Sequence, residues 1–389
     1  MAKAEANRVG LYYYKESSWA ETPSTPIMKE LPYTGEALKH NKDTVSSATI
    51  RADRNTDTLA EVGAGGDGDV NFEFRNSDYI PFIEAALGSV AATATETGAG
   101  SPGDIQFAVA GGGVQVITGA PSGWTDNYLV GAWGKIASAA QSANNGIFKI
   151  TAKDATTLTV ANTAGVAENS SSAVITQKVI RNGVTKMSFL LEKRFSDISK
   201  FQYFKGMRVG QWSMNVASKA VITGSFSFMG AEGIPSATTI GNATSTAKSS
   251  DQIINATTNI GSVYEGGSAL TTGIKSIDFT VNNNLRALDG IGNRAAIDIN
   301  QGSMLIEGTM NAYFEDIALL QKFYSHTSSS FSMRLTDEGG KVMIITFPRL
   351  YFSEGAPLAS GINTDVMIPL KFQAIYDATT TCQIQVDIL

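Results

Sequence analysis

The sequence of 389 residues has little of the chemistry on which enzymes and metal centres depend. It holds two histidines, His40 and His326, and one cysteine, Cys382. One cysteine allows neither a disulfide within the chain nor a cysteine-based metal site, so Cys382 is predicted to be a small core or strand residue. The histidines do not show the spacing of a metal site, and no convergent set of titratable groups suggests catalysis. We therefore predict no catalytic, cofactor-binding or metal-binding residue.

Charge and long apolar runs are also scarce. Charged residues make up 17% of the chain, its net charge is −6, and Lys and Arg form no cluster. A nucleic-acid-binding protein would carry a basic patch, so specific DNA binding is not expected. No apolar run approaches the roughly 20 residues that span a bilayer, and the N-terminus lacks the apolar run of a signal peptide. We expect no membrane insertion and synthesis in a cytoplasm without a standard secretion signal.

The chain does contain one unit that occurs twice, an alternating strand that runs into a short amphipathic helix. The first copy is a strand at 68–74 and a helix at 79–87, and the second is a strand at 308–314 and a helix at 317–324. In both copies a glycine precedes the strand, and acidic residues at the junction favour the positive end of a helix dipole. Apolar residues at helical spacing predict that each helix buries one face on a sheet.

The segments after each unit follow a similar order, with one large difference. Residues 188–193, 201–214 and 221–229 match residues 330–335, 342–352 and 366–374. Between the first helix and its next strand lie residues 95–180, which hold many short β-type runs separated by turn residues, as in a small all-β domain. The second copy has only a few residues at this place. The pattern predicts a small domain inserted at an exposed loop.

The fold class predicted from these patterns is mainly β. We expect two tandem β-sandwich or half-barrel modules, each with one short α-helix, and the small all-β inserted domain. The expected boundaries are 1–94 with 181–232 for the first module, 95–180 for the insert, 233–269 for a linker and 270–389 for the second module.

Residues 7–35 are expected to be irregular because they hold three prolines, and 91–100 is expected to be a low-complexity linker. Long polar, glycine-rich loops are expected at 53–66 and 285–293, which suits a functional or interfacial role.

A repeated module has a consequence for assembly. If such modules close a ring, each chain fills two positions, so a ring of six modules needs three chains. Closure also removes the unpaired sheet edges of an isolated β module.

Four segments taken together resemble the tail tube proteins of long-tailed, siphovirus-type bacteriophages. They are LPYTGEAL at 31–38, SSATIRADR at 46–54, GDVNFEF at 68–74 and IEAALG at 83–88. The segment FKGMRV at 204–209 is similar to a later strand of that family. The resemblance covers most of 30–90 and 180–230, and it reaches the second half only through the internal repeat.

The resemblance implies a structural virion protein, the major subunit of the tail tube. Rings would stack into a hollow tube, lined by a continuous β-barrel, that holds a tape measure protein and later conducts DNA. The implied partners are copies of itself, the tape measure protein, tail terminator and distal tail or baseplate proteins, and double-stranded DNA in transit without specific binding. The implied location is the virion tail, assembled in the host cytoplasm, with the insert on the tube exterior.

In such tubes the long loop after the first strand reaches the neighbouring ring. By position, this role falls on seven candidate residues in the two polar loops: Asp53, Arg54, Asp57, Glu61, Leu285, Arg286 and Asp289.

Two other functions fit the same patterns. One is the inner tube of a contractile tail or injection machine, which a neighbouring sheath gene would indicate. The other is a surface-displayed β-sandwich binding module, for example for carbohydrate, which would need clustered aromatic residues and an export route. The four tryptophans, Trp19, Trp124, Trp133 and Trp212, are scattered along the chain and are predicted to pack in cores or interfaces.

Overall fold

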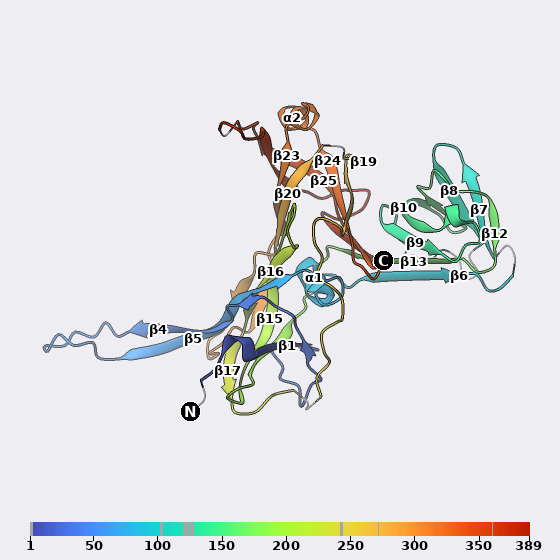
Figure 1. Cartoon of the computed structure of the whole chain (residues 1–389). Helices are drawn as coiled ribbons and strands as arrows, with labels where there is room; N and C mark the ends of the chain where they lie inside the picture. The colour runs from blue at the N-terminus through green and yellow to red at the C-terminus, as the bar shows by residue number, and fades with distance from the viewer. Residues whose placement is uncertain are drawn as a thin grey trace. The chain divides into compact units, whose positions relative to one another are not determined.

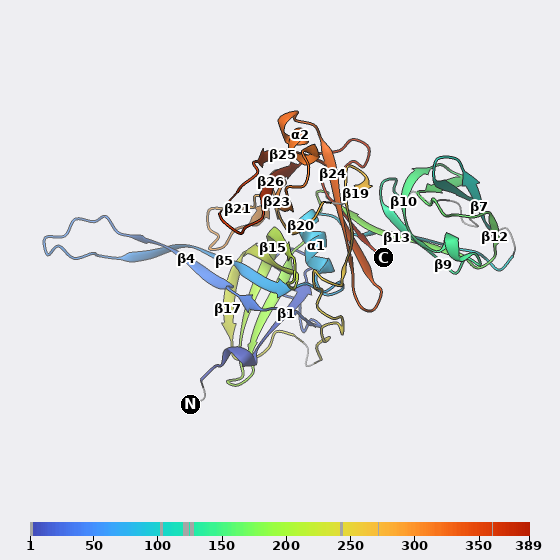
Figure 2. The same cartoon turned by 45° about the horizontal axis from the view of Figure 1, so that its top comes forward.

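Strands dominate the protein. The computed structural model describes residues 3–101, 104–119, 124, 128–241, 244–270, 272–359 and 361–389. Figures 1 and 2 show that most of this chain is in strands, which confirms the mainly β prediction. The two predicted helices are also confirmed, as α1 (Ile80–Leu87) and α2 (Ala318–Tyr324).

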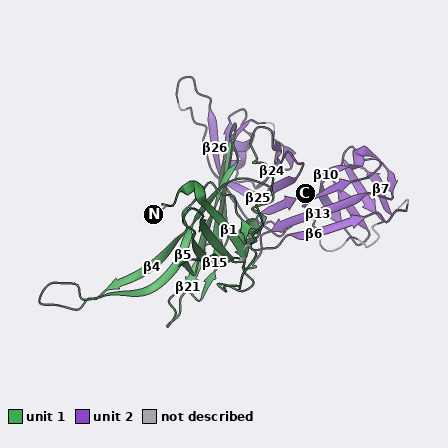
Figure 3. Cartoon of the chain, turned by 60° about the horizontal axis from the view of Figure 1, so that its bottom comes forward, with its two compact units in different colours: residues 1–88, 184–256, 276–309 green, residues 89–183, 257–275, 310–389 purple. Residues whose placement is uncertain are grey.

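The chain divides into two compact units, which Figure 3 colours separately. Unit 1 comprises residues 1–88, 184–256 and 276–309, and unit 2 comprises residues 89–183, 257–275 and 310–389. The range expected as an insert therefore belongs to the same unit as most of the range expected as the second module.

Unit 1 is built around the long strand β15. Its strands are β1 (Val9–Lys15), β2 (Lys29–Glu30), β3 (Gly35–Glu36), β4 (Lys39–Ser46), β5 (Leu59–Glu73), β14 (Phe189–Phe195), β15 (Lys200–Ala217), β16 (Thr223–Gly230), β17 (Glu232–Ser236), β20 (Ile274–Asn282, from Ser276 on), β21 (Arg286–Leu288) and β22 (Asp298–Asn300). The first half of β15 pairs with β14 and β17, and its second half pairs with β16 and β20. β1 extends the sheet beyond β14, and β5 extends it beyond β16.

Helix α1 covers the apolar face of this sheet. Phe82 is fully buried, and its ring lies 4.6 Å from Phe189 and 4.8 Å from Tyr13 between ring centroids. Pro81 suits the first turn of a helix, where its missing N–H is not needed. Gly88 ends the helix at φ 60°, a left-handed conformation that glycine adopts without strain. The helix is therefore held by its aromatic contacts and bounded by local sequence.

Unit 2 holds the remaining strands. They are β6 (Ala92–Thr97), β7 (Ile105–Ala110), β8 (Val114–Thr118), β9 (Trp133–Ala137), β10 (Gly146–Lys153), β11 (Thr157–Val160), β12 (Glu168–Ser170), β13 (Val174–Arg181), β18 (Ile260–Glu265), β19 (Ser268–Ala269), the end of β23 (Leu305–Tyr313), β24 (Ser329–Thr336), β25 (Val342–Gly355), β26 (Met367–Ala374) and β27 (Gln385–Ile388).

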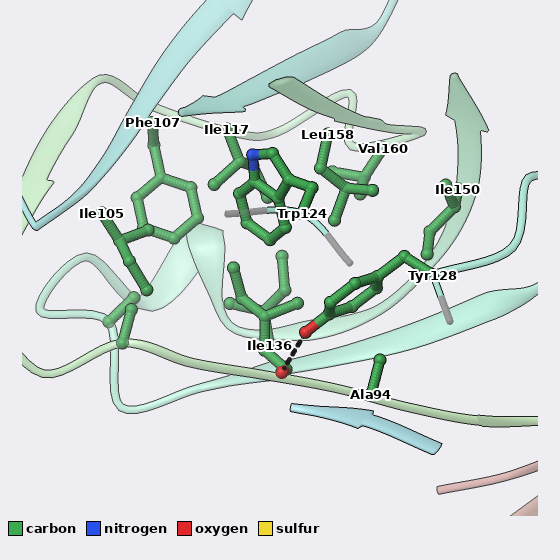
Figure 4. Close-up of a cluster of buried hydrophobic side chains, with 13 residues drawn as sticks. Ala94, Ile105, Phe107, Ile117, Trp124, Tyr128, Ile136, Ile150, Leu158 and Val160 are labelled. Carbon is green, nitrogen blue, oxygen red and sulfur yellow. Dashed lines mark hydrogen bonds between the residues drawn. The ribbon is translucent and has the colours of Figure 1, made fainter. Parts of the chain in front are cut away.

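The strands β6–β13 enclose a core of their own, shown in Figure 4. Trp124 and Tyr128 meet edge to face, with ring centroids 5.5 Å apart, and the hydroxyl of Tyr128 donates to the carbonyl of Ile175 at 2.8 Å. β13 also pairs outside this group. It pairs with β6 and β9 within the group and with β27 near residue 389. The group is therefore joined through its sheet to the last strand of the chain.

The pairing order of unit 1 occurs again in unit 2. β14, β15 and β16 pair in succession, and β24, β25 and β26 do the same. β17 lies beside the start of β15, and β27 lies beside the start of β25. The last residue of each predicted strand makes the same bond, since the amide of Phe74 donates to the carbonyl of Ile222 at 2.8 Å and that of Phe314 donates to the carbonyl of Val366 at 3.0 Å.

Four local predictions differ from the structure in whole or in part. Residues 9–15 form β1, because Leu11 and Tyr13 alternate into the core and all three prolines lie further along the chain. Residues 92–97 form β6, whose small side chains alternate against β13. The range 53–66 is only partly a loop, since β5 begins at Leu59. The range 233–269, expected as a linker, contains β18 and β19.

Each of the two histidines contacts a neighbouring group, and the cysteine is buried in the core. Nδ1 of His40 accepts a hydrogen bond from the amide of Gly233 at 3.2 Å. His326 follows α2 and stacks on Tyr351, with ring centroids 4.5 Å apart. Cys382 is fully buried, as expected of a core residue.

Candidate functional site

The most exposed element of unit 1 is the hairpin of β4 and β5. Its strands pair from Lys39 with Asp67 to Ser46 with Leu59, and Figures 1 and 2 show it extending well beyond the unit 1 sheet. Four apolar side chains near its end are open to solvent: Val45 at 55%, Ile50 at 97%, Leu59 at 65% and Val62 at 58% exposure. Apolar side chains grouped on a projecting element indicate a surface for a protein partner.

Arg51 organises the tip of this hairpin. Its guanidinium lies 2.7 Å from Asp53 on one side and 2.7 Å from Asp57 on the other. The hydrogen bonds from Arg51, followed by those from Asn55, lower the pKa of Asp53 to about 2. Arg54 takes a φ of 64° at the turn. Three of the seven candidate residues, Asp53, Arg54 and Asp57, are therefore gathered here, around an arginine that was not among them.

Glu61 occupies the centre of a charge network lower on the hairpin. Its carboxylate lies 2.7 Å from Lys42 and 2.6 Å from Arg294, and Arg294 also lies 3.1 Å from Glu232. Hydrogen bonds from Lys42 and Arg294 lower the pKa of Glu61 to about 2. The amide of Ala64 donates to the carbonyl of Arg294 at 2.8 Å. The structure thus brings the first polar loop against the second.

The second polar loop is a small hairpin of β21 and β22. Arg286 and Asp289 are exposed on it, whereas Leu285 is half-buried. The base of this hairpin is fixed by Asp298, which lies 2.7 Å from the buried Arg208 and 2.9 Å from Lys186. Arg286 and Asp289 are therefore presented from a rigid base.

Sequence reasoning missed Arg51, Lys42 and Arg294. Arg51 stood in the family-like segment 46–54, and its spacing to Asp53 and Asp57 was a usable signal. The contact of Arg294 with Glu61 joins residues 233 positions apart, and no local pattern could have found it.

A glycine in FKGMRV explains how the N-terminal arm is held in unit 1. Gly206 has a φ of 68°, and a Cβ there would lie 2.9 Å from the indole nitrogen of Trp19. The carbonyl of Gly206 accepts from Trp19 at 3.0 Å, and its amide donates to Glu16 at 2.8 Å. Burial raises the pKa of Glu16. A side chain at position 206 would therefore push the arm away from β15.

The second feature of unit 1 is a polar sheet face on β5, β16, β15 and β20, whose side chains are exposed or half-buried. Register places twelve side chains on it in three rows: Asp69, Ser227, Gln211 and Asn282; Asn71, Ser225, Ser213 and Thr280; Glu73, Thr223, Asn215 and Asp278. The opposite face carries Val70, Phe72, Trp212, Phe226 and Phe279, all buried. Alternation along the strands thus separates an apolar core from a polar surface.

The polar face has one sign of charge. Asp69, Glu73 and Asp278 are acidic, and none of the twelve side chains is basic. Burial raises the pKa of Asp278. The middle row consists of short side chains, and the hydroxyls of Ser213 and Ser225 lie 2.8 Å apart. The result is a smooth, weakly acidic surface.

In unit 2 the corresponding pair β25 and β26 also carries polar residues. Tyr351 lies opposite Gln373, and Glu354 lies opposite Lys371. The carboxylate of Glu354 and the amine of Lys371 are 2.7 Å apart, and Arg349, the other cation of β25 and β26, lies over the ring of Tyr351.

Within the residues that the structure describes, no group of three or more His, Cys, Asp or Glu residues is placed to hold a metal ion. In the same residues, no helix has the length and hydropathy needed to cross a membrane.

Comparison with known proteins agrees with the surfaces just described. A family model described as "Phage tail tube protein" matches residues 6–374. Comparison with curated proteins gives no match. Because the family model covers nearly the whole chain, this protein belongs to the phage tail tube proteins, structural virion components that assemble with copies of themselves and with other tail components.

Proposed function

We propose that this protein is the major tail tube subunit of a siphovirus-type phage and that the polar face of unit 1 lines the lumen of the tube. The observation that carries the proposal is the twelve-residue face, whose side chains are all exposed or half-buried and none of which is basic. DNA carries closely spaced negative phosphates, and binding to protein depends on neutralising them with Lys and Arg. An acidic wall of short side chains offers no such sites, so DNA passes without being held. Before ejection, the same wall surrounds the tape measure protein.

Rings in this proposal contain three chains. Support comes from the two sets of strand pairings, β14–β15–β16 and β24–β25–β26, which give each chain two similar building blocks. Three chains then supply six blocks in a pseudo-hexameric ring, and neighbouring blocks cover one another's open strand edges. The modules retain the boundaries 1–94 with 181–232 and 270–389, and the β domain at 95–180 lies on the tube exterior.

Contact between rings is assigned to the β4–β5 hairpin and the β21–β22 hairpin. The residues proposed for this contact are Asp53, Arg54, Asp57, Glu61, Leu285, Arg286 and Asp289. Support comes from the exposed apolar side chains at the hairpin tip and from the ion pair that joins the two hairpins.

The remaining partners follow from the same role. They are the tape measure protein inside the tube, a terminator at one end and distal tail or baseplate proteins at the other. Assembly takes place in the host cytoplasm, the protein has no enzymatic activity, and no cofactor or membrane insertion is needed. The inner tube of a contractile tail or injection machine is a second candidate, since the polar face would serve equally well there.

The test combines imaging with labelling of the lumen. Purified protein should form hollow tubes in negative-stain electron micrographs, with three chains per ring by native mass spectrometry of the ring. Cys382 is fully buried, so an added cysteine can be labelled selectively. Thr280→Cys should be blocked from a bulky maleimide once tubes form, whereas the exposed control Val184→Cys should stay reactive. Equal labelling of Thr280→Cys in subunits and tubes would place the polar face outside the lumen.

A further inference from the structure

Unit 2 contains a pocket that the tube role does not use. Its volume is about 590 Å³, within the range of small-molecule sites. Strands β9 and β10 form one wall, and β18, β24, β25 and β27 form the other. Every residue that lines it belongs to unit 2.

The floor of the pocket is a row of polar side chains across one sheet. Tyr264 lies opposite Ser332, Ser332 opposite Thr346, and Thr346 opposite Gln385. Residues directly opposite each other share a face, so the row presents a phenol, two hydroxyls and an amide together. Gln385 is fixed, because its oxygen accepts from Arg181 at 2.9 Å and its nitrogen donates to Asp387 at 2.8 Å.

The other wall supplies an aromatic surface. Trp133 comes from β9, and its ring centroid lies 6.0 Å from that of Tyr264. Ile147 and Lys149 extend this wall from β10. The pocket therefore combines flat apolar rings with a hydroxyl-rich floor.

Two buried polar atoms of the pocket lack a partner among the described residues. They are the indole nitrogen of Trp133 and the hydroxyl of Thr346. Thr346 as a whole is only 7% exposed. Buried polar groups are almost always satisfied in native proteins, and leaving one unsatisfied is costly. A molecule bound in the pocket can supply the hydrogen-bond partner that each of these two atoms lacks.

We propose that this pocket binds a neutral sugar ring, a hexose or N-acetylhexosamine of a glycan. The C–H face of a pyranose packs on the rings of Trp133 and Tyr264. Its hydroxyl oxygens accept from the Trp133 indole, and its hydroxyl groups pair with Thr346 and Ser332. The lining has one cation, Lys149, and one carboxylate, Asp377, so no excess charge favours a phosphate or another anion.

The probes are D-glucose, D-galactose and N-acetyl-D-glucosamine, added separately to the full-length protein. Saturation-transfer difference NMR should show transfer to the ring C–H protons of at least one sugar, with a saturable change in tryptophan fluorescence. Thr346→Val keeps the shape of the side chain and removes the hydroxyl, and Trp133→Phe keeps a ring and removes the N–H. Each should weaken binding by roughly tenfold or more, because a site built around a hydroxyl rejects a mismatched partner. Thr280→Val, a strand threonine in unit 1, is the matched control and should bind as the wild type does.

Three results would overturn the proposal. Absence of saturable binding by all three sugars is one, and unchanged affinity in both pocket variants with wild-type melting temperatures is another. The third is loss of sugar binding in assembled tubes together with protection of Trp133 from N-bromosuccinimide, which would assign the pocket to a segment of a neighbouring copy. Because the free subunit is tested as well as the tube, failure here leaves the tube role unaffected.

Discussion

The side chain of Arg294 lies 2.6 Å from the carboxylate of Glu61 and so joins the β21–β22 hairpin to the long β4–β5 hairpin. The two loops come from distant parts of unit 1, and their backbones also meet where Ala64 donates to the carbonyl of Arg294. Hydrogen bonds hold the pKa of Glu61 at about 2, so this pair stays charged throughout the physiological pH range.

The first prediction concerns this pair. Glu61→Gln should loosen the base of the hairpin and raise the protein concentration needed for tube formation by roughly tenfold or more, because many copies of the contact act together. Thermal unfolding of the subunit should hardly change, since exposed ion pairs add little stability. Sedimentation of tubes against concentration measures the effect. Arg294→Gln removes the other partner of the pair and should raise this concentration to a similar extent, and normal assembly of Arg294→Gln would show that the pair itself does not matter.

The second prediction concerns the hairpin tip. Ile50→Ser should leave the subunit folded, because the side chain is 97% exposed and exposed substitutions change the free energy of unfolding by no more than about 0.5 kcal/mol. It should nevertheless reduce tube length in electron micrographs, since the substitution removes the apolar contact proposed between the hairpin tip and the next ring. Val184→Ser is the matched control at 91% exposure and should form normal tubes. Equal effects of the two substitutions would contradict a special role for the tip.

The third prediction concerns the polar face. Asp69→Lys with Asp278→Lys should still assemble but should retain double-stranded DNA, since phosphates then find cations in the lumen. Retention should fall steeply between 50 and 200 mM salt, which are roughly the conditions over which counterion release weakens such binding. Fluorescence anisotropy of labelled DNA added during assembly is the readout. Glu21→Lys with Glu338→Lys adds the same charge at exposed positions that are not among the twelve residues of the face, and equal DNA retention by that control would argue against a lumenal face.

The fourth prediction concerns pH and the buried Asp387. Its carboxylate accepts from the amide of Trp133 at 2.9 Å and from Gln385 at 2.8 Å, yet complete burial raises its pKa from 3.8 to about 7. The folded state therefore binds a proton more tightly than the unfolded state between pH 4 and 7. The free energy of unfolding must fall as pH rises through that window, by up to about 4 kcal/mol from this group.

Asp387→Asn isolates this contribution. The variant cannot ionise at position 387, so the difference in unfolding free energy between wild type and variant should shift with pH between 4 and 7 and stay constant above 8. Urea denaturation at a series of pH values measures it. If the free energy of unfolding depends on pH in the same way in both proteins, the pKa of Asp387 does not change on unfolding.

Much of the fold could be predicted because it follows strict alternation. Phe72 and Phe74 alternate with polar residues and then lead into α1, and both features were visible in the sequence. The same alternation also contained the polar face, since Asp69, Asn71 and Glu73 occupy the intervening positions. What was missing was the register that places Ser225 and Ser213 beside them, and register depends on pairing between distant strands.

The failures have a common physical cause. β1 and β6 are strands whose partners, β14 and β13, lie far along the chain, and their local composition gave weak signals. The Thr346 and Trp133 atoms of the unit 2 pocket come from segments more than 200 residues apart. Sites built by long-range pairing leave no spacing pattern for sequence reasoning to find.

The pairing of β13 with β27 has a consequence for biosynthesis. Ile180 lies opposite Val386, so this edge of β13 stays unpaired until residues about 200 positions further along the chain have been synthesised. At roughly 5–20 residues per second, the interval is on the order of 10 to 40 seconds. During that time one edge of β13 has no strand partner in the nascent chain, although β6–β13 have all been synthesised. Translation that stops before β27 would therefore release subunits in which this edge of β13 is unpaired and open to association with other chains.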